Sequence, residues 1–300
     1  KTKINFLRIL IFTFCIYLIT MDKTFIFWGT DEFSVKILET LTKRELEPAL
    51  IVTVPDKPQG RKNIIVPSPV KVWAQTKGID ILQPPSLRNP DFAEQLKAKG
   101  AAFFLVASYG KIIPTDILAI PPKGTLNIHP SLLPKYRGPS PLETAILAGE
   151  TETGVTIMLV DEEMDHGPIL ANQKISLRDQ YSFERLRDET AVIGANLFAD
   201  ILPGYLAGSL EPKAQEHSAA TYTKKFTRKD GRLDLSATPT ENYRKILALN
   251  PWPGAYFIDQ HGNRQIKVKV KKAKLENGEL IFERVIPEGR KEASWADYLR

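Results

Sequence analysis

The chain of 300 residues contains a single cysteine, Cys15. Disulfide scaffolds and cysteine-based zinc sites need more than one cysteine, so both are excluded, and such low usage is typical of a reducing compartment, which we expect to be the cytoplasm. The chain also lacks the unbroken apolar run of about 20 residues that a membrane-spanning helix requires. With 43% hydrophobic and 25% charged residues, the composition indicates a globular protein rather than a disordered, collagen-like or multi-span membrane protein.

Several ligand-binding fingerprints are missing as well. The first apolar run, Phe25 to Trp28, is closed by Gly29 alone and not by a G-x-G-x-x-G turn, so dinucleotide binding has little support. No G-x-S-x-G motif is present, which argues against a serine hydrolase. The acidic segment 161–167 has no calcium-loop spacing, and we expect no metal site.

The first 20 residues differ from the rest of the chain. Residues 6–19 are almost wholly apolar, and two lysines precede them, as in the charged and apolar regions of a signal peptide. No small-x-small cleavage site follows, and Met21 stands directly before a strand-like run. We therefore expect Met21 to be the start of the native protein and residues 1–20 to be an upstream extension.

Positive charge is concentrated towards the C-terminus. Residues 1–210 hold 23 basic and 23 acidic side chains, whereas residues 211–300 hold 18 and 12. Such asymmetry favours a polyanion-facing module beside a neutral one, although a solvated face is the alternative. A loop rich in proline and glycine adds Lys57, Arg61 and Lys62, which either contact phosphate or belong to a mobile solvated loop.

Five short apolar runs alternate with stretches of helical spacing in residues 21–208. This pattern predicts an α/β domain with a mostly parallel sheet covered on both faces. The runs are residues 25–28, 49–54, 103–107, 125–128 and 155–160. Beyond them, residues 266–270 alternate apolar side chains with lysines, and Asn277-Gly278 is typical of a β-hairpin turn. Residues 209–300 are thus predicted to form a small, β-rich, basic domain.

Two helices have clear end signals. Ser140 predicts the start of one helix, with Glu143 completing a capping box and Gly149 ending it. Ser182 predicts the cap of a longer helix that ends before Pro203.

Two segments carry the residue types that catalysis needs. Side chains two apart on a strand share a face, so Asn127 and His129 point the same way at the carboxyl end of a strand, where open parallel sheets bind ligands. An amide donor beside an imidazole suits a developing oxyanion, although the pair could serve only the turn before Pro130. Residues 161–167 follow the fifth run and are expected at the same edge, where Asp165 could orient His129 and accept a proton. A solvated acidic loop is the alternative.

A set of motifs spread through the chain resembles one known superfamily. The motifs are Phe27-Trp28-Gly29-Thr30 with Phe33, Asn127-x-His129-Pro-Ser-Leu-Leu-Pro-x-x-Arg137-Gly138-x-x-Pro141, Thr153-Gly154-Val155-Thr156, and Asp165-x-Gly167. They are similar to those of the folate-dependent formyltransferases. Further motifs resemble the members that formylate methionyl-tRNA, namely Pro55-Asp56-Lys57-Pro58-x-Gly60-Arg61, Pro67-Ser68-Pro69-Val70-Lys71, Tyr222-x-Lys224-Lys225 with Asp230-Gly231, and Ala248-Leu249-Asn250-Pro251-Trp252-Pro253-Gly254-Ala255. The match extends from about residue 21 to the C-terminus.

The resemblance implies transfer of a formyl group from the co-substrate 10-formyltetrahydrofolate to the α-amine of methionyl-initiator tRNA, which supports translation initiation. By motif position it makes Asn127, His129 and Asp165 catalytic: the first two stabilise a tetrahedral intermediate, and Asp165 assists proton transfer. It also implies a Rossmann-like catalytic domain over residues 21–208 and a shortened OB-like, tRNA-binding domain over residues 209–300.

Binding residues follow from the same resemblance. For the folate they are Ser108, Tyr109, Gly110, Lys111, Ser131, Leu132, Leu133, Pro134, Asp161 and Gly167. For the tRNA they are Lys57, Arg61, Lys62, Arg137, Lys224, Lys225, Lys269 and Lys271. We expect a monomer without stable membrane association.

The sequence departs from the family pattern at four places. Asp31 stands where proline or serine is usual, which we expect to alter only a helix start. Residues 62–64 replace a more basic stretch, so the loop should bind phosphate more weakly. His166 replaces a small polar residue beside Asp165. The C-terminal domain is short between Lys274 and Glu279, which bears on tRNA binding and not on the chemistry.

Two other functions compete with this interpretation. A related formyltransferase acting on an amino-sugar nucleotide would share Asn127, His129 and Asp165 but would not need Lys57, Arg61 or a basic C-terminal module. A non-enzymatic RNA-binding protein would explain the basic region but not the three residues in their folate-type context.

Overall fold

A computed structural model describes residues 22–59, 63–177, 181–261 and 264–300. The expected extension over residues 1–20 lies outside the described residues, as do Arg61 and Lys62 of the basic loop. The chain forms two compact units. The first comprises the chain up to His129, Val155–Gln173 and Ala191–Glu216, and the second comprises Pro130–Gly154, Lys174–Thr190 and His217–Arg300.

A seven-stranded sheet in the order β5-β2-β1-β6-β7-β8-β9 confirms the predicted α/β architecture. Its strands are β1 (Phe25–Gly29), β2 (Leu50–Val52), β5 (Ile81–Leu82), β6 (Phe103–Ala107), β7 (Thr125–His129), β8 (Glu152–Leu159) and β9 (Ile169–Ser176). The helices of the same part of the chain are α2 (Glu32–Lys43), α3 (Pro69–Lys77), α4 (Pro90–Ala98), α5 (Thr115–Leu118) and α7 (Phe183–Leu206). A small hairpin, β3 (Lys57–Gln59) and β4 (Ile64–Val66), precedes α3.

The fifth predicted strand runs in an unexpected direction. The pairs from β5 to β7 are parallel, but β8 is antiparallel to β7, with His129 opposite Thr156. Segment 161–167 therefore leaves β8 at the edge opposite to the carboxyl end of β7. The parallel direction assumed for this strand is wrong, although Asp165 still contacts His129 and Asn127. A fully buried strand has the same apolar pattern in both directions, so the residues could not reveal this.

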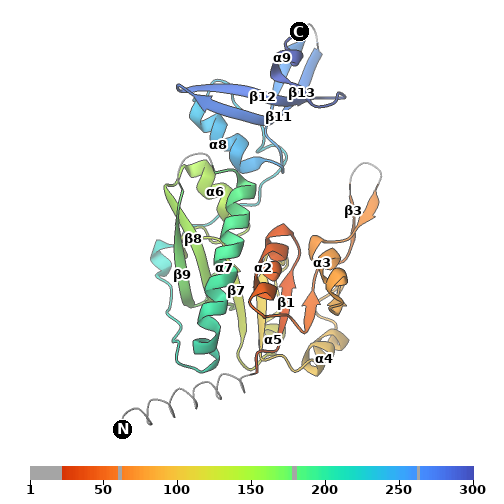
Figure 1. Cartoon of the computed structure of the whole chain (residues 1–300), viewed down its shortest axis with the longest axis vertical. Helices are drawn as coiled ribbons and strands as arrows, with labels where there is room; N and C mark the ends of the chain where they lie inside the picture. Colours follow the sequence, from red (N-terminus) through yellow and green to blue (C-terminus); the bar gives the residue numbers. More distant parts are fainter. Residues whose placement is uncertain (1–21, 60–62, 178–180, 262–263) are drawn as a thin grey trace, which may run out of the picture. The chain divides into compact units, whose positions relative to one another are not determined.

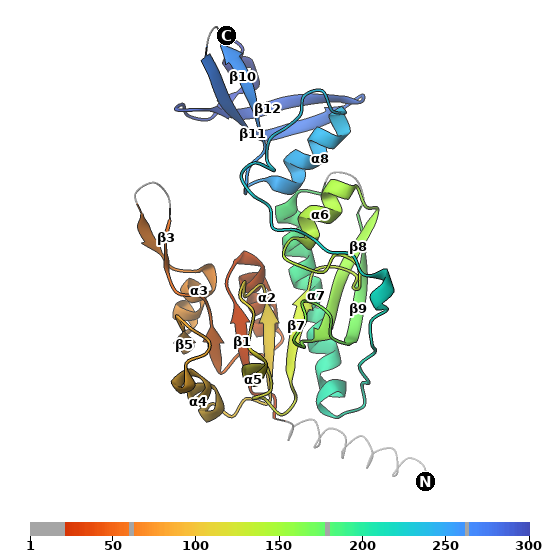
Figure 2. The ribbon, with the colours of Figure 1, turned by 180° about the vertical axis from the view of Figure 1, so that it is seen from behind.

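The two faces of β7 have different neighbours. A Cβ on Gly194 of α7 would lie 2.6 Å from the Ile128 side chain, so α7 packs closely against that face. Figures 1 and 2 show α2 and α7 on the same face of the sheet. Alternation along the strand directs Asn127 and His129 to the other face. Trp28, Val106 and Asn127 are neighbours across β1, β6 and β7, and such neighbours lie on the same face of the sheet. On this face Trp28 packs edge-on against Phe92 of α4.

Both predicted helices form, but their ends differ from the expectation. α6 (Pro141–Ala148) ends at the left-handed Gly149, whereas Ser140 makes no side-chain cap, so the predicted capping box is wrong. The Ser140 backbone has ψ 53°, away from extended geometry, and its N–H donates to Thr223 Oγ1. α7 continues through Pro203 to Leu206, so the predicted end before Pro203 is wrong.

The second unit contains the predicted antiparallel sheet, in the order β10-β11-β12-β13. Its strands are β10 (Tyr256–His261), β11 (Arg264–Glu276), β12 (Glu279–Pro287) and β13 (Ala293–Ser294), with the helical segments α8 (Pro239–Leu249), α9 (Trp295–Tyr298) and a 3-10 turn at His217–Ala219. Asn277 and Gly278 have φ of 52° and 82°, which confirms the hairpin turn. Helix α8 was not predicted, although Thr238 and Glu241 form a complete capping box.

No helix in the part of the chain that the structure describes is long and apolar enough to cross a membrane.

Candidate active site

The site is built on the carboxyl end of β7. His129 is the last residue of the strand and is 4% exposed, and Asn127 is half-buried two residues earlier. Both side chains lie on the same face. Because β6 and β7 are parallel, this end of β7 lies at the sheet edge where α/β proteins bind their ligands.

A loop between β8 and β9 brings a carboxylate to these two residues. Asp165 Oδ1 lies 3.6 Å from His129 Nδ1 and 3.5 Å from Asn127 Nδ2. The three catalytic residues that the family resemblance implied therefore lie together within the first unit. An amide donor, an imidazole and a carboxylate in this order can stabilise an oxyanion and move a proton. Catalytic contacts of this length can shorten when substrate binds.

Local backbone geometry fixes how the loop approaches β7. Asp165 has a left-handed backbone, with φ 51°. A Cβ on Gly167 would lie 2.0 Å from the Leu159 carbonyl oxygen, so only glycine allows the loop to pass this close to β8. Gln215, a residue that the sequence did not single out, donates from Nε2 to the carbonyl oxygens of Asp165 and Gly167. The loop is thus held on both sides of His166, directly after the Asp165 side chain.

The carboxylate of the neighbouring Asp161 is already engaged. Asp161 Oδ2 lies 2.7 Å from His166 Nδ1, and Asp161 Oδ1 accepts from the backbone N–H of Glu163 at 3.1 Å. His166, the residue that departs from the family pattern, is therefore turned towards Asp161. In the described residues, no group of three or more His, Cys, Asp or Glu side chains could hold a metal ion.

The predicted folate loop 108–111 lies at the topological switch point of the sheet. The strand order places β1 beside β6, and the crevice between such strands is the usual ligand site. Ser108 has φ 52° and donates to Asp31 Oδ2. Asp31 also accepts from the Ser34 N–H as the N-cap of α2. The departure at Asp31 therefore reaches beyond the helix start, because it also anchors the loop.

Tyr109 forms the buried part of this loop. Its side chain is 2% exposed and packs edge-on against Trp28, with ring centroids 5.1 Å apart. Its hydroxyl makes no hydrogen bond to a described residue, and burial raises the pKa of that hydroxyl to about 12. The next residues are more open, since Gly110 is exposed with φ 77° and Lys111 is half-buried.

The remaining folate residues implied by the motif belong to the second unit. Ser131 is buried and donates to the Lys135 carbonyl oxygen at 2.7 Å, which closes a tight turn. Leu133 is buried, while Leu132 and Pro134 are half-buried.

The basic loop of the first unit is described in part. Lys57 is exposed on β3. Asp56, the residue before it, accepts from Gln83 at 2.7 Å and from Lys71 at 2.6 Å, and these contacts lower the pKa of its carboxyl group. The Asp56 charge is therefore neutralised locally and leaves Lys57 available for an anion.

Arg137, which the family resemblance assigned to the tRNA, is a buried residue. It is 1% exposed, and its guanidinium lies 2.9 Å from His217 Nδ1 and 3.3 Å from the Tyr222 hydroxyl. Backbone hydrogen bonds also join its N–H to Thr221 and its carbonyl oxygen to Thr223. In this structure Arg137 faces the protein segment around Tyr222.

Two further predicted cations lie just beyond this segment. Lys224 pairs with Asp230 at 2.7 Å, which holds the pKa of that carboxyl group well below its usual range. Lys225 is exposed.

The β10–β11 pair presents a row of basic side chains. Lys267, Lys269 and Lys271 alternate along β11 with buried valines, and Lys269 and Lys271 are exposed. Lys267, which the sequence did not single out, lies with Nζ 3.5 Å from the Tyr256 ring centroid. Its pKa is lowered by burial and by the charges of Lys269 and Arg228. Cations crowded together in this way favour an anionic partner.

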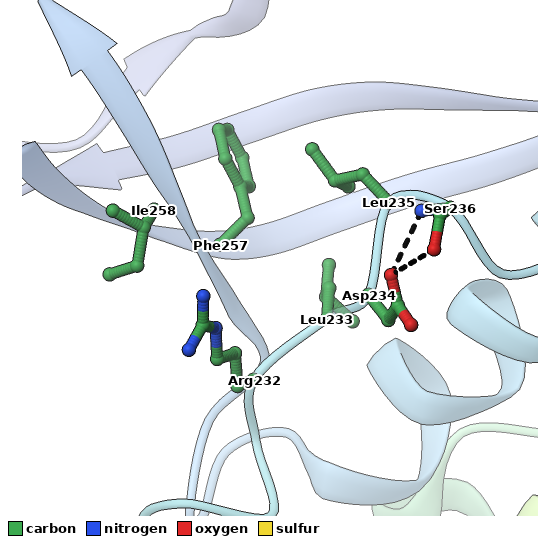
Figure 3. Close-up of a pocket in the computed structure, with 7 residues that line it drawn as sticks. All are labelled: Arg232, Leu233, Asp234, Leu235, Ser236, Phe257 and Ile258. Atoms are coloured by element: carbon green, nitrogen blue, oxygen red, sulfur yellow. Dashed lines mark hydrogen bonds between the residues drawn. The ribbon is translucent and has the colours of Figure 1, made fainter.

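A pocket of about 540 Å³ lies beside these strands in the second unit. It is lined by Arg232, Leu233, Asp234, Leu235, Ser236, Phe257 and Ile258. Figure 3 shows the Arg232 side chain directed towards the pocket, while Asp234 is turned to Ser236, which donates to it from N and Oγ. The pocket therefore presents a cation beside apolar walls.

Comparison with known proteins identifies the family. The family model for formyl transferase matches residues 22–202, and the one for the formyl transferase C-terminal domain matches residues 225–283. A methionyl-tRNA formyltransferase of Chloroflexus aurantiacus is 47% identical over 231 residues, covering 77% of this chain and 74% of the relative. That of Bacillus pumilus is 36% identical and covers 92% and 93%.

Solved structures share the fold. The methionyl-tRNA formyltransferase from Clostridium thermocellum superposes with a TM-score of 0.60 at 18% identity, covering 88% of this chain and 98% of that one. The family model and the sequence relatives show that the chain belongs to the methionyl-tRNA formyltransferase family.

Proposed function

We propose that the protein transfers the formyl group of 10-formyltetrahydrofolate to the α-amine of methionyl-initiator tRNA, in the cytoplasm and as a monomer. The observation that carries this proposal is the position of Asp165, whose Oδ1 lies within 3.6 Å of both His129 Nδ1 and Asn127 Nδ2. Such a group of one acid and two donors at a strand end is suited to acyl transfer to an amine.

In this reaction the amine nitrogen forms a bond to the formyl carbon, and the carbonyl oxygen takes the negative charge. Asn127 Nδ2 and the His129 ring donate hydrogen bonds to that oxygen. Asp165 holds His129 in place and accepts the proton that the amine loses. The bond between the formyl carbon and the folate nitrogen then breaks, that nitrogen takes up the proton, and formylmethionyl-tRNA and tetrahydrofolate leave.

We assign the folate to the crevice beyond β1 and β6. The loop there is tied down by the Ser108–Asp31 contact and by the Thr30 hydroxyl, which donates to the Tyr109 carbonyl oxygen at 2.9 Å. A rigid loop with an exposed Gly110 suits recognition of the flat pterin ring by backbone groups. From the family resemblance, the proposed folate-binding residues also include Ser131 to Pro134, Asp161 and Gly167.

We assign the tRNA to two basic regions. The first unit contributes Lys57, Arg61 and Lys62, and the second unit contributes Lys224, Lys225, Lys269 and Lys271. Arg137 is left out of this set because it is buried against the segment around Tyr222. To these the structural environment adds Lys267, Arg228 and the pocket residue Arg232. Cations of this kind position RNA through its phosphates rather than through its bases. We accordingly treat residues 209–300 as the tRNA-binding domain and residues 21–208 as the catalytic domain.

An acceptor competition assay tests the proposal. The purified protein is given 10-formyltetrahydrofolate with methionyl-initiator tRNA, with uncharged initiator tRNA, or with an amino-sugar nucleotide. Formylation of the charged tRNA alone is the expected result, because only that acceptor offers both an α-amine and an RNA backbone. Formylation of the amino sugar alone would support the sugar formyltransferase instead, and tRNA binding without any transfer would support a non-enzymatic RNA-binding protein.

A further inference from the structure

The loop that carries Asp165 is joined to a distant part of the chain by one side chain. Gln215 follows the first domain's last long helix, 50 residues beyond Asp165, and is 5% exposed. Its Nε2 donates to the Asp165 carbonyl oxygen at 2.9 Å and to the Gly167 carbonyl oxygen at 2.7 Å. One amide group thus uses both of its hydrogens on the backbone that flanks His166.

The backbone fixes where Gln215 stands. Ile169 and Lys213 form an antiparallel bridge with two hydrogen bonds, of 2.7 Å from the Ile169 N–H and 2.8 Å from the Lys213 N–H. Antiparallel register places residues two before and two after this bridge opposite each other, so Gln215 faces Gly167. The contact therefore follows from strand-like pairing and does not depend on a mobile surface side chain.

Asp165 needs such support for two reasons. Its φ of 51° is a left-handed conformation that aspartate adopts less readily than glycine, so contacts with its surroundings help to hold it. Its carboxylate lies 3.5 Å from Asn127 Nδ2 and 3.6 Å from His129 Nδ1, beyond the usual hydrogen-bond range of about 2.7–3.2 Å, so a small shift of the backbone decides whether hydrogen bonds form.

We propose that Gln215 is a positioning residue for the formyl transfer reaction: by holding the carbonyl groups on either side of His166, it sets the distance of the Asp165 carboxylate from His129 and Asn127. This inference rests on the proposed function, in which Asp165 accepts a proton. Gln215 itself touches neither substrate, and it acts through Asp165.

Replacing Gln215→Leu tests the inference, because leucine has a similar volume and cannot donate. We expect kcat to fall about 10–100-fold, the range that a misplacement of about 1 Å can cause, with KM for both substrates within about threefold of wild type. Gln173→Leu on the exposed part of β9 is the matched control and should leave kcat unchanged. Equal binding stoichiometry for 5-formyltetrahydrofolate in all three proteins shows that the folded fractions match.

Two kinetic measurements distinguish a positioning role of Gln215 from a general loss of structure. In an Asp165→Asn background, Gln215→Leu should lower kcat by no more than about twofold, since the group it positions no longer acts. In Gln215→Glu, the new carboxylate faces two carbonyl oxygens, which raises its pKa, and once protonated it can donate to one of them. The kcat of Gln215→Glu relative to wild type should therefore rise as the pH falls.

The outcomes distinguish this inference from the proposed function. If the wild-type protein does not formylate methionyl-tRNA, the proposed function fails, whatever Gln215 does. A crystal structure of Gln215→Leu tests the positioning itself: the separation of Asp165 Oδ1 and His129 Nδ1, 3.6 Å here, should increase. An unchanged separation, or a wild-type kcat in Gln215→Leu, would overturn the inference.

Discussion

Asp165 combines a carboxylate that acts in catalysis with a left-handed backbone, φ 51°. Asparagine adopts this conformation more readily than alanine and keeps the side-chain shape, so Asp165→Asn removes the charge alone. We expect Asp165→Asn and Asp165→Ala both to lower kcat about 10²–10⁴-fold, as loss of a general base does. Only Asp165→Ala should also lose about 1–2 kcal/mol of unfolding free energy, the cost of a left-handed alanine.

Steady-state kinetics and thermal unfolding of the two variants measure these effects. Near-wild-type kcat in Asp165→Asn would contradict the proton-accepting role of Asp165. Equal unfolding temperatures for Asp165→Asn and Asp165→Ala would show that the left-handed backbone has no energetic cost.

The same residues show what sequence can predict at this scale. The motifs that contain Asn127, His129 and Asp165 are sequence-local, so these residues could be identified and the structure brings them together. Gln215 gave no such signal. Its role depends on the Ile169–Lys213 bridge, a pairing between segments that are distant in sequence and that neither periodicity nor composition reveals.

Among the secondary-structure elements, the β11–β12 hairpin carries the exposed lysines of the second unit. Its turn needs φ 82° at Gly278, and a Cβ there would meet no atom within 4 Å. Gly278→Ala should thus cost only backbone strain, about 1–2 kcal/mol, and loosen the strand that presents Lys269. We expect a lower unfolding temperature and a several-fold higher KM for tRNA, with the KM for folate unchanged.

Gly208→Ala is the matched control for the hairpin. Gly208 has φ 71° and equally open space around its Cα, but it ends α7. It should show a similar loss of stability with a normal KM for tRNA. If both variants bind tRNA normally, the hairpin takes no part in tRNA recognition.

Local signals predicted this hairpin, because Asn-Gly fixes a turn by its own conformational preferences. Local signals also predicted that α6 and α7 form, but they gave the wrong cap for α6 and the wrong end for α7. Ser140 donates its N–H to Thr223 Oγ1 and does not cap its helix, and Pro203 is accommodated within the last turn of α7. The direction of β8 was not accessible either, since it depends on pairing with β7 and not on its own residues.

At the scale of the whole molecule, the sequence revealed how charge is distributed along the chain but not how the chain divides into two units. Residues 211–300 hold 18 basic and 12 acidic side chains, and this excess of positive charge indicated an anionic partner. Three of the five boundaries between the two units, however, fall within β8, β9 and α7, and each unit is assembled from separate stretches of the chain. Elements that continue across a boundary leave no linker composition for a sequence analysis to detect.

Because of this charge distribution, we expect salt to change the KM for tRNA and not the KM for folate. Each phosphate contact releases counterions, so log KM for tRNA should rise with log salt concentration by about 0.7–0.9 per contact. We expect the Lys267→Ala/Lys269→Ala double variant to reduce this slope by about 1–2, to raise the KM for tRNA at low salt, and to leave kcat and the KM for folate unchanged. Lys97→Ala, which removes an exposed lysine paired with Glu94 on α4, is the control and should keep the wild-type slope. A double variant with an unchanged slope would show that the lysines beside Tyr256 contact no phosphate, which would remove Lys267 and Lys269 from the tRNA-binding surface.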